Sequence, residues 1–386
     1  MSKRIKKKFI GFYLFALILP LPFPLWVSSV AMGVLFLNSL ILVKKKPQYN
    51  TLIISFALFF FSDFLSLFFS GRGVFENTII NDVKIACAIL PFTFYNSRIK
   101  TKELQSQVFV FFVIGVFTYI LYACLYYIYF IQIHPRYTVQ IDNYLFWAIE
   151  NRFPGTYHRT YVGVYIVFSS ILTNIWLFNA KSNKRILWGL LFVFQMIGIF
   201  FLGSKLTMVM FLVLNLILIL NNFRFLAIPF ITCAIVGFYL IKEWVFTSMK
   251  KSIQDRLIFF DESLNLINNH LFFGIGERNI TKYMVEINKE MTPLIPHNIF
   301  LKETLSNGIL GLIFLLFLIG VIIYQALKEK NLILNFFIAL IITVSLIEDF
   351  IYLQRGLFFF IFFTLLMLNF NNKDKWTNEK TSNMTV

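Results

Sequence analysis

The feature that most constrains this chain is a succession of apolar runs, many close to about 20 residues long, along most of its length. Hydrophobic residues fill 58% of its 386 positions and charged residues only 14%, whereas soluble domains carry about 25% charge. A helix of about 20 apolar residues crosses the hydrocarbon core of a bilayer. The runs are continuous and do not alternate with polar residues, as barrel strands would. We therefore expect an all-α polytopic integral membrane protein.

The apolar runs predict about twelve transmembrane helices. The basic start, Lys3 to Lys8, could imitate a signal peptide, but no small-residue cleavage pattern follows it. We therefore interpret the first run as an uncleaved span. The spans are expected near residues 9–24, 25–43, 51–70, 78–96, 106–131, 160–179, 186–202, 206–220, 225–241, 298–324, 331–347 and 354–370.

The distribution of charge predicts the orientation, because cytoplasmic loops collect Lys and Arg. With a cytoplasmic N-terminus, the segments on that side hold the whole net charge of +16, since the remaining chain has equal numbers of basic and acidic residues. Both termini are then cytoplasmic. Orientation and anionic lipid headgroups account for the basic charge, so membrane lipid is an expected partner and nucleic acid is not.

The same topology places all four histidines in two long outer segments. The first region, 1–241, holds nine spans and an outer loop near 132–159. A large extracytoplasmic loop follows at 242–297, between the ninth and tenth spans. Spans ten to twelve occupy 298–370, and a polar cytoplasmic tail occupies 371–386.

The loop at 242–297 is expected to be folded and helical. Apolar residues recur at helical spacing between Ser252 and Asn268, which predicts an amphipathic helix on the membrane surface, with Arg256 beside the apolar stripe. The sequence Gly274-Ile275-Gly276 predicts a tight turn with close backbone approach. A second helical piece should run from Glu277 to Met291. The loop would then bring Arg256, Arg278 and His297 to one outer surface.

The stretch from Pro296 to Leu316 joins a polar helix start to an apolar span. Proline favours the first turn of a helix, so a helix starting near Pro296 would place His297 among unpaired backbone N–H groups. Such a helix start can hold a phosphate and disfavours a protonated imidazole. The alternative is that His297 only caps a transmembrane helix at the interface.

Four blocks of the sequence resemble the O-antigen ligase and polymerase superfamily. They are DRLIFFDESLNLINNHLFFGIG, PHNIFLKETLSNGILGLIFLL, GTYHRTYVGVY and FLGSKLTMVMFLVL, within roughly residues 150–325. Members of that superfamily have many spans and a large extracytoplasmic loop after the ninth. The resemblance implies transfer of a glycan from undecaprenyl diphosphate to a lipid A-core sugar hydroxyl. It places the site at the outer face of the bacterial cytoplasmic membrane and implies neither a metal nor a cofactor.

The resemblance also implies roles for individual residues. His297 matches the motif histidine and would assist the acceptor's proton, and Arg256 matches the loop arginine and would bind the diphosphate. The structural alternative is that Arg256 reaches to lipid phosphate from an interfacial helix. Further candidates for binding the diphosphate or the substrate are Lys205, Arg159, His158, Arg278 and Asn298. Lys205 stands where the family commonly has arginine, and lysine keeps the charge without the bidentate geometry.

Two alternatives stay open. A polymerase of the same superfamily would use another lipid-linked glycan as acceptor, although the shorter first outer loop favours a ligase. A lipid-linked oligosaccharide flippase would also have about twelve spans, and Asp63, inside a predicted span, is costly in lipid unless it faces the bundle interior. The sequence lacks the Asp-x-Asp, HExxH and Gly-x-Ser-x-Gly motifs of nucleotide-sugar, zinc and serine enzymes.

Overall fold

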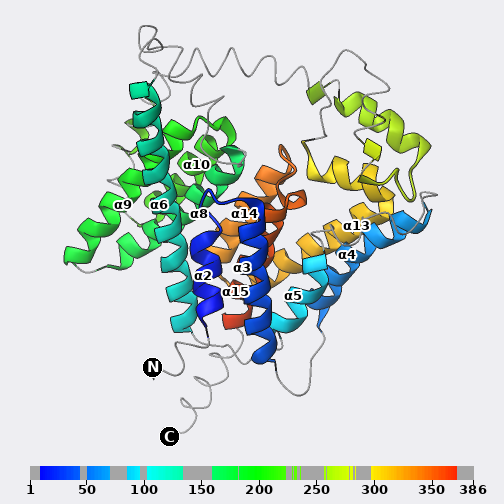
Figure 1. Cartoon of the computed structure of the whole chain (residues 1–386), viewed down its shortest axis with the longest axis horizontal. Coiled ribbons are helices and arrows are strands. Elements are labelled where there is room, and N and C mark those ends of the chain that lie inside the picture. Colours follow the sequence, from blue (N-terminus) through cyan, green and yellow to red (C-terminus); the bar gives the residue numbers. More distant parts are fainter. Residues whose placement is uncertain are drawn as a thin grey trace, which may run out of the picture. The chain divides into compact units, whose positions relative to one another are not determined.

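The structure is a computed structural model of the whole chain, and it describes residues 9–43, 50–69, 85–95, 102–133, 159–180, 182–222, 259–277 and 297–371, with short pieces between 228 and 283. The described residues form helices and their connections, without a strand (Figure 1). They fall into two compact units, each described by itself: Met1–Asn38 with Lys102–Val245, and Ser39–Thr101 with Phe246–Val386.

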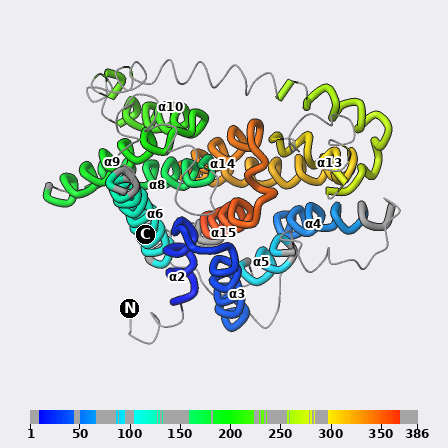
Figure 2. Tube along the Cα trace, turned by 45° about the horizontal axis from the view of Figure 1, so that its top comes forward, coloured from blue at the N-terminus to red at the C-terminus, as the bar shows by residue number. Residues whose placement is uncertain are grey.

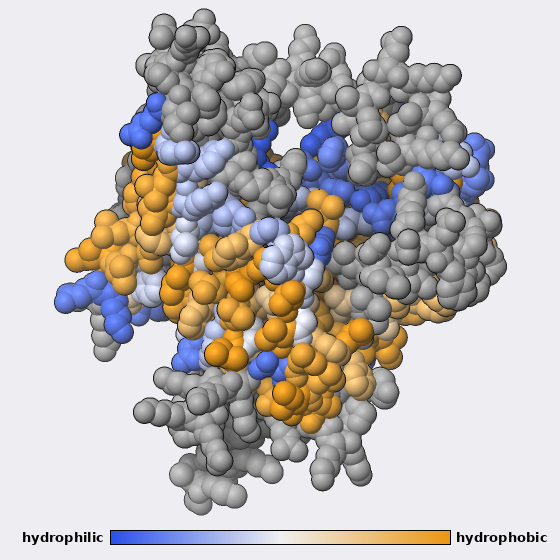
Figure 3. Space-filling model, in the orientation of Figure 1, coloured by the Kyte–Doolittle hydropathy of each residue, from blue (hydrophilic) through white to orange (hydrophobic). Residues whose placement is uncertain are grey.

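Five helices in the described part of the chain are long and apolar enough to cross a membrane: Leu104–Tyr126, Arg159–Asn179, Asn183–Leu202, Lys205–Asn222 and Ile299–Lys328. Shorter apolar helices accompany them at Leu25–Ile41, Thr51–Leu65, Leu332–Ser345 and Gln354–Leu368. Hydrophobic residues cover much of the described surface in Figure 3. The expected all-helical, multi-pass membrane protein is confirmed, whereas the number of about twelve crossings stays a prediction. The predicted ninth span, 225–241, lies largely outside the described residues.

The first unit is built around α8 (Arg159–Asn179), the most buried of the five candidate spans. It packs against α6 (Lys102–Ile133), α9 (Ser182–Leu202) and α10 (Lys205–Asn222), and α2 (Ile10–Ile18) packs on α6. Buried amides connect these helices. Asn174 Nδ2 donates to Asn215 Oδ1 at 2.8 Å, and Asn215 Nδ2 donates to Ser170 Oγ at 2.8 Å. These bonds satisfy polar groups that the apolar interior would otherwise leave unpaired.

The second unit is built around α13 (Ile299–Lys328), along which α4 (Thr51–Phe69) lies (Figure 2). The chain leaves α13 for α14 (Leu332–Ser345), the short 3-10 helix η3 (Phe350–Tyr352) and α15 (Gln354–Asn371), and α15 packs on α5 (Ile85–Tyr95). Tilted and edge-on phenylalanine rings join α14, η3 and α15, among them Phe337, Phe350 and Phe359. α3 (Leu25–Ile41) ends in this unit, where Ser39 Oγ donates to Thr93 at 2.9 Å.

A break divides α13 at Gly308, whose φ of 68° and ψ of −167° belong to a region that essentially only glycine adopts. The turn Leu271–Gly276 forms backbone hydrogen bonds with the residues on both sides of the break. Ile275 N–H donates to the carbonyl of Leu305 at 2.7 Å, Gly276 N–H to that of Ser306 at 2.9 Å, and Ile309 N–H to that of Leu271 at 2.7 Å. The predicted tight turn is confirmed, with positive φ at both Gly274 and Gly276.

Candidate functional site

The polar start of α13 is fixed by Asn298. Its side chain accepts hydrogen bonds from the backbone N–H groups of Phe300 and Leu301, which makes Asn298 the N-cap. Its Nδ2 also donates to the carbonyl of Leu346 at 2.9 Å. The side chain of Asn298, a predicted substrate ligand, thus orders the helix start and ties it to the segment after α14.

The expected position of His297 was wrong by two residues. The helix begins at Ile299, so His297 lies just before the cap and not among the first-turn N–H groups. The cap Asn298 fixes the helix start more strongly than Pro296 does, because its side chain satisfies two of the unpaired donors. The contacts of the His297 ring therefore come from neighbouring side chains and not from backbone N–H groups of the helix start. The His297 side chain is 35% exposed.

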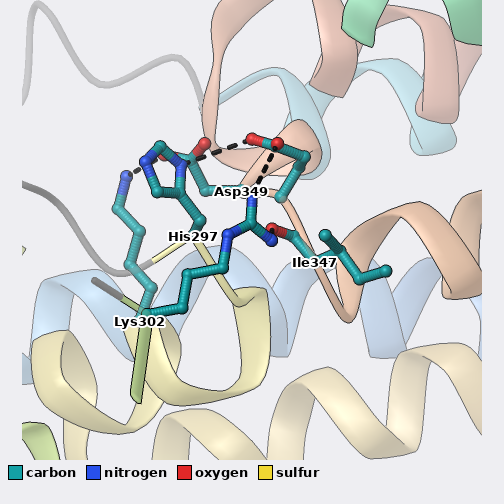
Figure 4. A network of polar contacts seen from close by, with 6 residues as sticks. His297, Lys302, Ile347 and Asp349 are labelled. Atoms are coloured by element: carbon teal, nitrogen blue, oxygen red, sulfur yellow. Dashed lines mark hydrogen bonds and ion pairs between the residues drawn. The ribbon is translucent and has the colours of Figure 1, made fainter. Parts of the chain in front are cut away.

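Glu348 contacts both residues that were predicted to be catalytic. Its Oε2 lies 3.3 Å from Nδ1 of His297, and its Oε1 accepts from Nη2 of Arg256 at 3.2 Å. Arg256 Nη1 also donates to the carbonyl of Ile347 at 2.8 Å. Figure 4 shows His297 and the Ile347–Asp349 segment in this network. One buried carboxylate thus contacts both Arg256 and His297.

Lys302 forms a second ion-pair cluster next to the first. Its buried Nζ lies 3.0 Å from Asp349 Oδ2 and 3.2 Å from Glu277 Oε1. The same Nζ stands 4.3 Å from the centre of the Tyr352 ring. A buried ammonium with two carboxylates and an aromatic face is well compensated. Lys302 and Asp349 therefore form a buried ion pair next to His297 (Figure 4).

A third polar group lies where α13 meets α4. Glu303, which is fully buried, accepts from Ser62 Oγ at 3.0 Å, from Asn307 Nδ2 at 2.7 Å and from the hydroxyl of Tyr352. Asn307 Nδ2 also donates to Asp63. The expectation that Asp63 faces other helices is confirmed within this unit. Tyr352 connects this group to Lys302.

Sequence reasoning missed Glu348 and Asp349. The signal was present, because two adjacent acidic residues stand between the predicted spans 331–347 and 354–370. The predicted topology places that connection on the same side as His297. Acidic residues in a short turn between apolar helices call for a cationic partner.

Three of these residues could geometrically hold a metal ion. Ligand atoms of His297, Glu348 and Asp349 lie within 4.8 Å of one another. Both carboxylates, however, already pair with Arg256 and Lys302 at 3.2 and 3.0 Å. A divalent cation would meet these two positive charges at close range. The charge arrangement favours an organic ion-pair network over a metal centre.

The remaining predicted site residues lie elsewhere in the chain. Lys205 begins α10 two residues after Gly203, which has a φ of 66°, and Arg159 begins α8. Both belong to the first unit. His158 and Arg278 lie outside the described residues. The described contacts therefore unite Arg256, His297 and Asn298 within the second unit.

Glu348 lies close to His297 without a hydrogen bond to it. Its Oε2 is 3.3 Å from Nδ1, but the contact lacks hydrogen-bond geometry. The two side chains are therefore neighbours at ion-pair distance.

A scan against models of protein families finds no match to this chain, and a search of curated proteins finds no match either. The functional interpretation therefore rests on the motifs in the sequence and on the geometry of the second unit.

Proposed function

We propose that this protein is a glycan transferase that resembles O-antigen ligases. It moves a glycan from undecaprenyl diphosphate to a sugar hydroxyl of lipid A-core. The proposal includes about twelve spans, cytoplasmic termini, the large outer loop at 242–297 and a site at the outer face of the bacterial cytoplasmic membrane.

The observation that carries the proposal is the contact of one buried carboxylate, Glu348, with both His297 and Arg256. Glycan transfer from a lipid diphosphate needs a base for the acceptor hydroxyl and a cation for the leaving diphosphate. His297 and Arg256 supply these two functions side by side. They lie at the start of a candidate membrane span, where a lipid-linked donor would present its headgroup.

In the proposed reaction, Nε2 of His297 takes the proton from the acceptor hydroxyl as that oxygen attacks the anomeric carbon. The bond from this carbon to the diphosphate oxygen breaks, and direct displacement inverts the configuration. Glu348 stabilises the imidazolium that forms. Arg256 uses further N–H donors of its guanidinium for the departing diphosphate. In this proposal Lys205, and as further ligands Arg159, His158 and Arg278, contribute to diphosphate binding.

The buried group around Glu303 and Asp63 favours one candidate of another class, a lipid-linked oligosaccharide flippase. Carboxylates deep between apolar helices are typical of transport paths. A flippase, however, needs no base at the outer surface, and it forms no new glycosidic bond. Substitution of His297 distinguishes the two classes.

The test is product analysis in proteoliposomes that contain the purified protein, undecaprenyl diphosphate glycan and lipid A-core. His297→Ala is the test variant. His270→Ala is the matched control, because His270 is an exposed histidine of the same loop whose ring faces Tyr283. We expect glycan on lipid A-core with the parent protein and the control, and a loss of at least about 100-fold with His297→Ala.

The products also separate the alternatives. Longer glycan that is still attached to undecaprenyl diphosphate would identify a polymerase. Translocated donor without any covalent product, unaffected by His297→Ala, would identify a flippase. Equal activity of the parent and His297→Ala would remove His297 from the mechanism.

A further inference from the structure

The helical residues before the Gly274 turn carry an exposed apolar surface. Leu257, Phe260 and Leu264 are exposed, and they recur at the spacing that places them on one helix face. Two residues of the following turn, Leu271 and Phe272, are exposed as well, Phe272 to 65%. We call these five residues the apolar loop face.

The same helix has a buried face that differs from this exposed one. Ser263 and Leu266 are buried, and Leu266 packs with Ile275, Ile280 and Leu305 of α13. The helix therefore carries more apolar side chains than those that it buries against α13. Exposed polar residues, among them Asn265 and Asn269, lie on the remaining side. The helix has one side for protein, one for water and one apolar side that the protein does not cover.

The break in α13 fixes where along that helix the apolar loop face lies. Between Ile309 and Lys328 the helix offers just the length of about 20 residues that crosses a bilayer core. The polar residues Lys302, Glu303 and Asn307 precede Gly308, so the apolar part of α13 begins after the break. The turn Leu271–Gly276 is bonded to the backbone at 305–309, so it is held where this apolar part begins.

The apolar loop face is joined to the part of α13 where exposed apolar residues begin. Exposed apolar residues of the membrane-spanning part begin with Ile313, Leu316 and Phe317, directly after the segment to which the turn is bonded. Large apolar side chains that stay exposed at the edge of a span fit the boundary between headgroups and acyl chains.

We propose that the apolar loop face is a membrane-binding surface that inserts into the acyl boundary of the surrounding bilayer. Phe260, Leu264 and Phe272 contact lipid chains, while Asn265 and Asn269 of the loop helix stay in water. Arg256, in the described part of this helix, is thereby held at the level of the lipid phosphates. This inference concerns the bilayer itself and is independent of which reaction the site performs.

The test measures the depth of single spin labels in the full-length protein. The three native cysteines are first replaced (Cys87→Ala, Cys124→Ala and Cys233→Ala). The protein is reconstituted in vesicles of phosphatidylethanolamine and phosphatidylglycerol. Electron paramagnetic resonance then compares collisions with oxygen, which concentrates in acyl chains, and with a water-soluble nickel chelate. The labelled positions are Phe260→Cys, Leu264→Cys and Phe272→Cys, with Asn265→Cys and Asn269→Cys as controls on the same helix.

We expect the ratio of oxygen to nickel collisions to be several-fold higher at the three apolar positions than at the two controls. Equal ratios at all five positions would place the helix in water and overturn the proposal. Low collision rates with both reagents at the apolar positions would show that protein covers this face, and would overturn it as well. All five positions are exposed, so the labels require no repacking, and a monodisperse elution profile checks the fold of each variant.

Discussion

The Oε2 atom of Glu348 lies 3.3 Å from Nδ1 of His297, although His297 precedes α13 and Glu348 follows α14. The other oxygen of the same carboxylate accepts from Arg256 at 3.2 Å. A single anionic side chain thus contacts both the histidine and the guanidinium. The proposed base and the proposed diphosphate ligand depend on each other through it.

The first prediction concerns this carboxylate. Glu348→Gln keeps the size of the side chain but removes its charge, so Arg256 loses its ion pair and His297 loses the anion that stabilises its protonated form. We expect kcat for glycan transfer to fall about 10- to 100-fold, with a smaller change in KM. Glu262→Gln, in the loop helix, is the control and should keep the parental rate. A parental kcat for Glu348→Gln would show that Glu348 does not position the histidine.

The second prediction concerns the buried lysine. Lys302→Met leaves Asp349 in a buried position without its cation, and removing one partner of a buried ion pair typically costs about 3 to 5 kcal/mol. We expect a clear drop in the thermal unfolding midpoint in detergent. Lys328→Met is the matched control on the same helix, because Lys328 is exposed and also lies over a tyrosine ring. Equal midpoints for the two variants would contradict the structural role of the ion pair.

The third prediction concerns the break in α13. Gly308→Ala forces a side chain into a backbone conformation that costs about 1 to 3 kcal/mol, and its Cβ would overlap the carbonyl of Phe272. We expect a lower unfolding midpoint and faster proteolysis of the outer loop. Gly320→Ala lies on the same helix with open space around its Cα, so it should be neutral or slightly stabilising. If both variants behaved alike, the docking of the turn on Gly308 would be wrong.

The fourth prediction concerns the first unit. Asn215→Leu removes the acceptor for Asn174 and the donor to Ser170 in the interior, which should cost about 1 kcal/mol. Asn222→Leu is the control, since Asn222 also donates to a carbonyl one turn back but stands at the exposed end of α10. Thermal unfolding of both variants measures the difference. An unchanged midpoint for Asn215→Leu would mean that the amide network adds no stability.

The sequence predicted the helices well because each depends on local composition. The run at 106–131 falls within α6, and the runs at 186–202 and 206–220 end and begin at the Gly203–Ser204 turn. The glycine turn at Gly274 was predictable for the same reason, because its backbone conformation requires glycine. The backbone carbonyls that the turn binds could not be predicted, because nothing in the sequence at Leu305 and Ser306 indicates this contact.

The site was predicted only in part, because its contacts join distant segments. The resemblance identified His297 and Arg256, but nothing local to either residue indicates Glu348 as their common partner. The start of α13 was placed two residues early because proline and asparagine compete as start signals, and the capping bonds of Asn298 decide between them. The roles of Lys205 and Arg159 stay predictions, since they depend on the placement of two units that are described separately.

The attachment of the outer loop to α13 has an evolutionary consequence. Its three bonds, from Ile275, Gly276 and Ile309, join backbone to backbone, so they make no demand on the chemical identity of the side chains. Apart from the positive-φ glycines at 274, 276 and 308, these backbone bonds do not depend on which side chains the turn carries. The loop can therefore change its exposed side chains while the protein keeps the same joint between the loop and α13.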